Sequence, residues 1–334
     1  MGVSAFTVGV DGHSLHADER AFLAEARPWG VILFARNIAT PDQTRALAGA
    51  IRDTLGEATP ILVDQEGGRV QRLFPPHWRQ WLPPLDHVQR AGGSARAMYL
   101  RGLLIGAELA DLGIDVNCGP TCDIATPETH PFLMNRCFGH DVETVTNMAR
   151  AMAEGLMDAG VLPVMKHMPG HGRGAVDSHH GLPVCDSDRA TLEVSDFAPF
   201  RKLNDLPMGM TAHMLFPQID ARPVTISPVL IDDVIRRDIG FDGLLMSDDI
   251  GMNALGGTVP ERAVAAQKAG CDLVLHCNGD LAERRAVAAV LDPMTPAGER
   301  RAAAALASRR VPVQIDIPAH EAELAALMRG KVYG

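Results

Sequence analysis

Eight short apolar runs constrain the fold of this chain most strongly, because each is followed by a polar residue and then by a longer helical pattern. The runs are continuous rather than alternating in polarity, and they span residues 6–10, 31–34, 61–63, 114–117, 162–165, 208–211, 244–246 and 273–275. Continuous apolar strands are typical of a parallel sheet covered on both faces. The alternation of such strands with helical segments therefore predicts an α/β protein with a parallel sheet.

Residues that start and end helices lie between these runs. Thr40-Pro41-Asp42-Gln43 forms a capping box with proline at the first helical position, and Gly56 ends that helix. Ser227-Pro228 begins another helix, and the segment 260–269 followed by Gly270 is a third. The Ala- and Arg-rich segment after residue 280 is expected to complete the outer layer of helices.

The number of strand–helix repeats favours a closed barrel. Eight repeats in about 280 residues predict a (β/α)8 TIM-type barrel, and we expect one domain over residues 1–334. A doubly wound open sheet is the alternative, and the absence of a GxGxxG turn after the first strand weakens it.

Composition excludes several functional classes. The 31 basic and 41 acidic side chains give a net charge of −10, and no Lys/Arg cluster is visible, so we expect no nucleic-acid partner. No apolar stretch of about 18 residues occurs, and the first residues lack the basic region of a signal peptide. We therefore expect a cytoplasmic protein with no membrane partner, and we expect a monomer.

Polar or titratable side chains follow nearly every run. In a parallel barrel the carboxyl ends of the strands share one rim, where the chemistry takes place. The predicted barrel therefore brings these residues to a common polar pocket. They are Asp11, Arg36, Asn37, Asp64, Gln65, Glu66, Asn117, Lys166, His167, His213, Asp248, Asp249 and His276.

Asp248 and Asp249 follow the apolar run in LLMSDDIGM. A carboxylate held at the end of a strand could attack an anomeric carbon or stabilise a cation there. Aspartate is also a favoured residue at the start of a helix. Both interpretations stay open, and two adjacent aspartates allow one to cap and the other to react.

The segment 166–183 holds four histidines and one aspartate within a glycine-rich loop. A zinc site is one hypothesis for it. Pro169 and Gly170 lie between His167 and His171 and forbid the helix on which paired zinc ligands sit, so we expect no metal. A second hypothesis is an acid/base pair in which Asp177 orients His179 and raises the pKa of its imidazole.

Asp64 begins the sequence DQEGGRV, whose paired glycines allow a ligand to approach the backbone closely. No lysine follows where a phosphate-binding loop would need one, and a carboxylate can accept hydrogen bonds from two vicinal hydroxyls. Arg136 in NRCFGHD could bind a ligand oxygen, or it could form a surface ion pair.

Five segments in this order resemble the β-N-acetylglucosaminidases of glycoside hydrolase family 3. They are DQEGGRVQRL at 64–73, NRCFGHD at 135–141, KHMPGHGRGAVDSHHGLP at 166–183, MTAHMLFPQID at 210–220 and LLMSDDIGM at 244–252. The chain is most similar to the short, single-barrel bacterial members that recycle the cell wall. The likeness covers most of residues 5–280, and its most specific part is the KH-x-PGHG…DSH stretch.

The resemblance implies a role for each site residue. Asp248 would be the nucleophile of a retaining double displacement, and His179 paired with Asp177 would be the acid/base. Asp64, Arg136, Lys166 and His167 would bind the terminal sugar, with His213 on the same rim. The implied substrate is a terminal β-linked N-acetylglucosamine on an anhydro-muropeptide fragment, and no metal or organic cofactor is implied.

Several other readings stay open. A neutral histidine repels an incoming anion less than a carboxylate does, so a phosphorylase that uses the same residues is an alternative. A substrate-assisted route through the acetamido oxygen would leave Asp177 and His179 without a role. A barrel metallohydrolase and a non-catalytic sugar-binding protein are further hypotheses. Met168 and Arg173 depart from the family pattern, which shows an aromatic and an acidic residue there.

Overall fold

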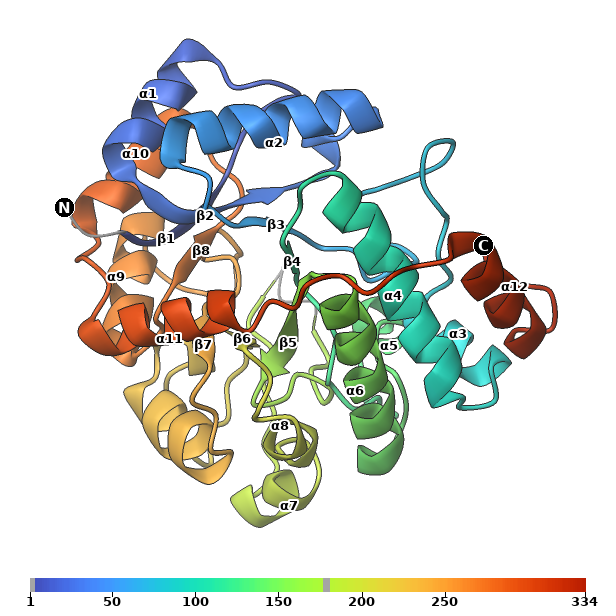
Figure 1. Ribbon diagram of the computed structural model, residues 1–334. Helices are drawn as coiled ribbons and strands as arrows, with labels where there is room; N and C mark the ends of the chain where they lie inside the picture. Colours follow the sequence, from blue (N-terminus) through green and yellow to red (C-terminus); the bar gives the residue numbers. More distant parts are fainter. Residues whose placement is uncertain (1–3, 177–180) are drawn as a thin grey trace.

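The computed structural model describes residues 4–176 and 181–334, and within them eight parallel strands form one sheet (Figure 1). The strands are β1 (Ser4–Gly9), β2 (Pro28–Leu33), β3 (Ile61–Val63), β4 (Val116–Asn117), β5 (Leu162–Met168), β6 (Met208–Thr211), β7 (Leu244–Met246) and β8 (Val274–His276). Neighbours in sequence pair with one another, and β8 also pairs with β1. A parallel bridge between Met246 and Leu273 brings β7 to the end of β8 and closes the circle. The predicted (β/α)8 barrel is confirmed, and the open sheet is excluded.

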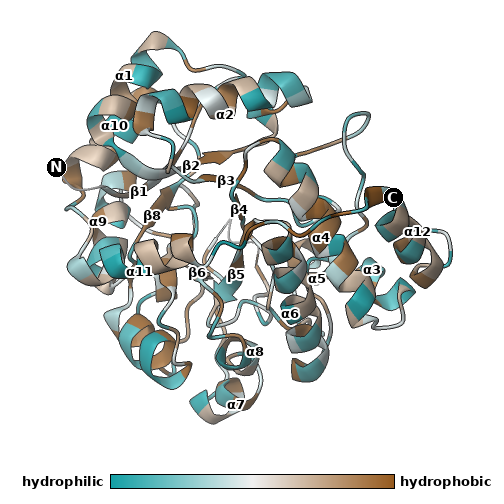
Figure 2. Cartoon of the chain, viewed as in Figure 1, coloured by the Kyte–Doolittle hydropathy of each residue, from teal (hydrophilic) through white to brown (hydrophobic). Residues whose placement is uncertain are grey.

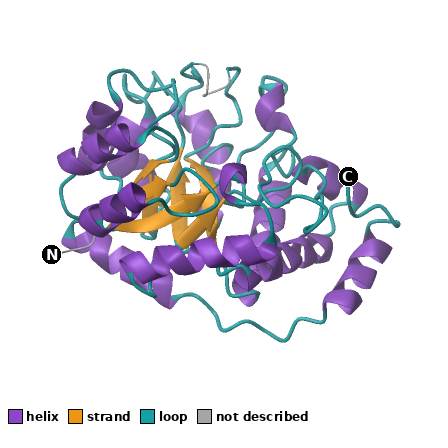
Figure 3. Cartoon of the chain, turned by 90° about the horizontal axis from the view of Figure 1, so that it is seen from above, coloured by secondary structure: helices purple, strands orange, loops and turns teal. Residues whose placement is uncertain are grey.

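Helices surround the strands, as the view from above shows (Figure 3). The α-helices are α1 (Ala17–Ala26), α2 (Pro41–Leu55), α3 (Pro84–Arg90), α4 (Ala95–Asp111), α5 (Pro131–Met134), α6 (Val142–Asp158), α7 (Arg189–Val194), α8 (Ala198–Lys202), α9 (Val259–Ala269), α10 (Leu281–Val290), α11 (Pro296–Ala307) and α12 (Ile317–Leu327). Two 3₁₀ turns, η1 (Ala35–Asn37) and η2 (Val224–Ile226), and one π-helix, η3 (Leu230–Asp238), complete the described helices. No described helix is long and apolar enough to cross a membrane.

The helix boundaries follow the capping residues of the sequence. The Thr40 side chain accepts a hydrogen bond from the Gln43 backbone at 3.3 Å, and Gly56 ends α2 with a φ of 111°. The Ser227 hydroxyl accepts from the Leu230 backbone at 3.0 Å, as a helix-starting serine should. The helix that follows is the π-helix η3 rather than an α-helix, although it still buries its apolar face.

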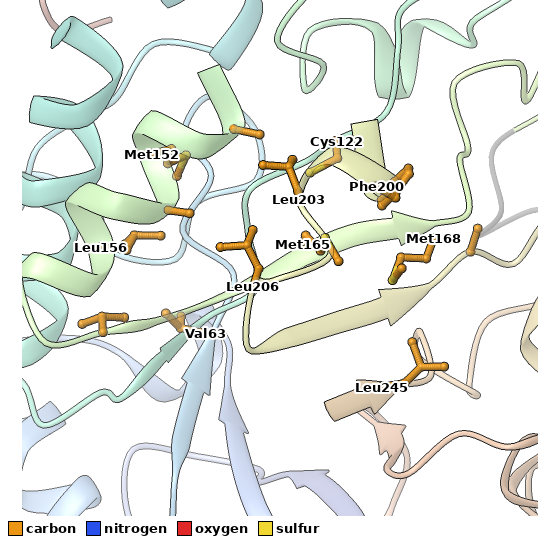
Figure 4. Close-up of a cluster of buried hydrophobic side chains, with 14 of the residues drawn as sticks. Val63, Cys122, Met152, Leu156, Met165, Met168, Phe200, Leu203, Leu206 and Leu245 are labelled. Atoms are coloured by element: carbon orange, nitrogen blue, oxygen red, sulfur yellow. The ribbon is translucent and has the colours of Figure 1, made fainter. Parts of the chain in front are cut away.

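The core has two parts, one inside the barrel and one between the barrel and its helices. Alternate strand residues, such as Ile32, Leu62 and Val164, gather inside the barrel. Their neighbours point outward against the helices, and Figure 4 shows this second layer around Met165 and Leu245. The helices that cover it carry both apolar and polar residues, as expected for helices with one buried face (Figure 2).

Helices α4 and α6 lie side by side and pack closely against each other (Figure 1). A methyl group at Gly155 would lie 2.2 Å from the Tyr99 carbonyl oxygen, and one at Gly102 would lie 2.3 Å from that of Met152. Both positions therefore require glycine.

The last segment of the chain departs from the expected outer layer. Helix α10 contacts α1 and α9, but the chain then crosses to the other side of the barrel, where α12 packs against α4 (Figure 1). Ion pairs from Arg309 to Asp115 and from Arg310 to Asp158 hold the connecting segment in place. Because α12 covers α4, it adds a layer outside the ring of helices rather than completing that ring.

Candidate active site

A cavity of about 560 Å³ opens at the carboxyl ends of the strands, where the sequence predicted a polar pocket. Six of the predicted residues line it, from β5 and from loops that follow other strands: Asp64, Arg136, Lys166, His167, Asp248 and Asp249. The barrel therefore brings together residues that are up to 185 positions apart, counted from 64 to 249.

A cluster of four charged side chains, three of them buried and Asp64 partly buried, forms one side of this cavity. The Lys166 ammonium lies 2.8 Å from Asp64 Oδ1 and 2.7 Å from Glu66 Oε1. Arg136 binds Glu66 through two parallel hydrogen bonds, of 2.9 and 2.8 Å. Arg136 thus forms a buried ion pair, not the surface ion pair that the sequence left open. With two cations and two carboxylates, the cluster carries no net charge.

The pKa values within the cluster favour the ionised forms. Burial alone would raise the pKa of the two carboxyls and lower that of the lysine. The opposite charges outweigh burial, so the pKa values of Asp64 and Glu66 are lowered and that of Lys166 is raised. The cavity thus presents fixed charges that can bind hydroxyl groups without changing their protonation.

His167 is oriented by Asp123, a residue that the sequence analysis missed. Asp123 Oδ2 lies 2.7 Å from His167 Nδ1, and Asp123 Oδ1 accepts a hydrogen bond of 2.7 Å from the His171 backbone. If Nδ1 donates its proton to the carboxylate, Nε2 is an acceptor that faces Arg136 Nη2 at 3.5 Å. Asp123 lies after β4 in a segment without regular structure, so no strand or helix pattern marks it.

Asp248 and Asp249 follow β7, and neither caps a helix as the sequence had allowed, because the next helix, α9, begins at Val259. Asp249 Oδ1 accepts hydrogen bonds of 3.0 Å from the backbones of Gly251 and Cys277, and so holds the turn. Both residues line the cavity, but among the described residues Asp248 accepts only from the Asp249 backbone, at 2.8 Å through Oδ1. Burial opposes ionisation of Asp248, but His213 and His167 nearby lower its pKa to about 2. Asp248 is therefore the ionised carboxylate available to a ligand.

His213 does not line the cavity. Its side chain is fully buried, with Nδ1 2.8 Å from the Thr225 hydroxyl and Nε2 2.9 Å from the Asp249 carbonyl oxygen. Both ring nitrogens are thus used inside the protein. The structure places His213 beneath the turn at 248–249, where it supports the turn instead of meeting a ligand on the rim.

The two departures from the family pattern lie outside the ligand-facing surface. Met168 is buried in the layer between barrel and helices (Figure 4), and Arg173 pairs with Asp196 at 2.8 Å. The predicted acid/base residues, Asp177 and His179, lie outside the described residues. Among the residues that the structure describes, no group of three or more His, Cys, Asp or Glu side chains is placed to hold a metal ion.

Comparisons with known proteins agree with this geometry. Residues 6–310 match the family model for the glycosyl hydrolase family 3 N terminal domain. A beta-hexosaminidase of Alkalilimnicola ehrlichii is 40% identical over 285 residues, which cover 83% of this chain and 82% of that protein.

Solved structures show the same likeness. The NagZ structure from Neisseria gonorrhoeae, in complex with N-trifluoroacetyl-D-glucosamine, has a TM-score of 0.85 at 29% identity and covers 98% of this chain and 99% of its own. A family 3 beta-N-acetylglucosaminidase from Paenibacillus sp. has a TM-score of 0.86 at 29% identity; the match covers 97% of this chain and 66% of that longer protein. The family match over most of the sequence and the shared barrel together show that this chain belongs to glycoside hydrolase family 3, among its beta-hexosaminidases.

Proposed function

We propose that the protein is a retaining exo-β-N-acetylglucosaminidase that removes terminal β-linked N-acetylglucosamine from peptidoglycan-derived anhydro-muropeptide fragments. The observation that carries this proposal is the position of Asp248. Its ionised carboxylate lines the same cavity as the charged cluster of Asp64, Arg136 and Lys166. A sugar held by that cluster would have its anomeric carbon within the same small volume as the nucleophile.

The proposed reaction has two steps. In the first, an Asp248 oxygen forms a bond to the anomeric carbon while the glycosidic C–O bond breaks. Protonated His179, oriented by Asp177, gives its proton to the departing oxygen. In the second step, neutral His179 takes a proton from water, whose oxygen bonds to the anomeric carbon and releases Asp248. The sugar leaves with its original β configuration.

The polar character of the cavity supports a sugar in preference to an apolar ligand. Carboxylate oxygens of Asp64 can accept from hydroxyl groups, and Lys166 and Arg136 can donate to them. The names of the related proteins support an N-acetylated hexosamine, since they include a beta-N-acetylglucosaminidase and an enzyme bound to an N-acylated glucosamine. We further propose a monomeric cytoplasmic enzyme that needs no cofactor, because the two steps above use only protein side chains and water.

The test uses an aryl N-acetyl-β-glucosaminide with wild-type protein, Asp248→Ala and a matched control, Asp53→Ala, on the exposed side of α2. We expect aryl release by wild type and control, loss of release by Asp248→Ala, and equal unfolding temperatures for all three. Proton NMR should detect the β-anomer of N-acetylglucosamine as the first product. An α-anomer, or a near-normal rate for Asp248→Ala, would contradict the mechanism.

Two further measurements address the acceptor and the aglycone. The reaction is repeated with inorganic phosphate, and the product is identified by mass. Free N-acetylglucosamine in both buffers supports a hydrolase, whereas N-acetylglucosamine 1-phosphate would show a phosphorylase. Comparison of kcat/KM for an N-acetylglucosaminyl anhydro-muropeptide and for chitobiose tests the substrate class. A preference for chitobiose would contradict the cell-wall assignment.

A further inference from the structure

His171 lines the cavity, yet the proposed mechanism does not use it. The residue is 93% buried, since its exposed fraction is 7%. Among the described residues, neither of its ring nitrogens has a hydrogen-bond partner. A buried polar group without a partner is costly, so each case calls for an explanation. The His171 ring lies 5.7 Å, centroid to centroid, from that of His167.

The backbone around His171 is held rigidly, so the ring is aimed into the cavity and not left there by a loose loop. Its backbone N–H donates to Asp123 Oδ1 at 2.7 Å, the same carboxylate that orients His167. Gly172 packs so closely that an added methyl group would lie 1.9 Å from the Ile124 carbonyl oxygen. A side chain positioned in this way suits a preorganised binding site.

The surroundings of His171 favour its neutral form. Asp123 and Asp248 would stabilise a charged ring, but burial and the neighbouring His167 outweigh them and lower the pKa of His171 to about 4. A neutral imidazole has one N–H donor and one nitrogen acceptor. It matches an uncharged hydroxyl, which can both donate and accept, better than it matches a carboxylate or a phosphate.

We propose that His171 is a further substrate-binding residue, and that its neutral ring exchanges a hydrogen bond with a hydroxyl group of the sugar. This inference rests on the proposed function, because it takes the sugar as the ligand of the cavity. It also explains why the ring has no partner among residues 4–176 and 181–334: bound substrate would supply one.

The test compares His171→Phe and His171→Gln with a matched control, His87→Phe. His87 in α3 is also buried without a partner for either ring nitrogen among the described residues, but it does not line the cavity. Substrates are an aryl N-acetyl-β-glucosaminide and its 3-, 4- and 6-deoxy analogues. Unfolding temperatures are measured for each variant.

We expect His171→Phe to lower kcat/KM for the parent substrate at least tenfold, with no fall in unfolding temperature, because phenylalanine removes two unpaired polar atoms. His171→Gln should recover part of the loss, and His87→Phe should stay within twofold of wild type. On the deoxy analogue that lacks the contacted hydroxyl, wild type and His171→Phe should have the same kcat/KM, because neither can form this hydrogen bond.

Other results would overturn the inference. They are a kcat/KM for His171→Phe within twofold of wild type, an equal loss for the parent and all three analogues, or a lowered unfolding temperature that accounts for the lost activity. If wild-type protein cleaves none of the substrates, the proposed function fails. Calorimetric titration with N-acetylglucosamine then decides the inference: tenfold weaker binding to His171→Phe supports it, and equal affinity or no binding to wild type overturns it.

Discussion

Replacement of Lys166 by methionine tests whether the charged cluster holds the site together. The lysine side chain is 2% exposed and contacts two carboxylates, Asp64 at 2.8 Å and Glu66 at 2.7 Å. Methionine has a similar length but no charge, so the variant leaves both carboxylates buried with one cation fewer. Glu66 keeps the paired hydrogen bonds of Arg136, and Asp64 keeps only a 3.3 Å contact with Arg72.

The expected loss follows from the cost of an uncompensated buried charge. Removal of one partner from a buried ion pair typically costs about 3–5 kcal/mol of unfolding free energy. For a chain of 334 residues, the entropy of unfolding is about 0.7 kcal/mol per kelvin. The unfolding temperature should therefore fall by about 4–7 °C at neutral pH.

The loss should depend on pH in a defined direction. The folded pKa values of Asp64 and Glu66 are lowered, so their stabilising contribution is present above the unfolded pKa, near 4, and is lost as the pH falls through the folded values. A protonated carboxyl does not need the ammonium group. The difference between wild type and Lys166→Met should thus be constant from about pH 5 to pH 9 and shrink below about pH 4.

The assay is urea unfolding at pH 7 and at about pH 3, below the unfolded pKa of the carboxyls, with Lys202→Met as the control. Lys202 lies at the exposed end of α8, and its replacement should change the unfolding free energy by less than about 0.5 kcal/mol. A loss below about 1 kcal/mol for Lys166→Met at pH 7, or the same loss at both pH values, would refute the reasoning.

Three further predictions concern other parts of the site and its support. Asp123→Asn should weaken the orientation of His167 and lower kcat/KM at least tenfold, measured on the aryl glycoside; an unchanged value would contradict the role of this carboxylate. Gly155→Ala should cost about 2–3 kcal/mol in urea unfolding, because its methyl group would meet the Tyr99 carbonyl at 2.2 Å; an unchanged midpoint would show that α4 and α6 can move apart. The pKa of Asp248 is lowered to about 2. Its side-chain carboxyl ¹³C resonance, assigned by its absence from the spectrum of Asp248→Asn, should therefore not shift between pH 7 and pH 4. A titration midpoint near pH 4 would contradict this prediction.

The strand pattern predicted most of the fold and much of the site, because both depend on local sequence. The runs at 61–63, 208–211 and 244–246 coincide with β3, β6 and β7, and the polar residues that follow the first and last of these, Asp64 and Asp248, line the cavity. The expectation that residues after each strand reach a common rim does not say which way a side chain points. It placed His213 on the rim, whereas Thr225 and the turn after β7 bind both of its ring nitrogens.

Asp123 could not be predicted for a different reason. Its partner His167 is 44 residues away in sequence, and the segment that carries Asp123 has no strand or helix pattern of its own. Only the packing of the β4 loop against the end of β5 brings the two side chains together. The partnership of Glu66 with Arg136, 70 residues apart, is likewise a product of the closed barrel.

The two carboxylates of the charged cluster are not equivalent, and the difference assigns their roles. Both oxygens of Glu66 accept hydrogen bonds from Arg136, and one also contacts Lys166, so this carboxylate has little capacity left for a ligand. Asp64 holds Lys166 at 2.8 Å through one oxygen, while the other has only the longer 3.3 Å contact with Arg72. A sugar hydroxyl can replace that weak contact without leaving a buried charge uncompensated, because Lys166 stays in place. Asp64 is therefore the carboxylate with hydrogen-bonding capacity left for a ligand, and Glu66 holds Arg136 and Lys166 in place.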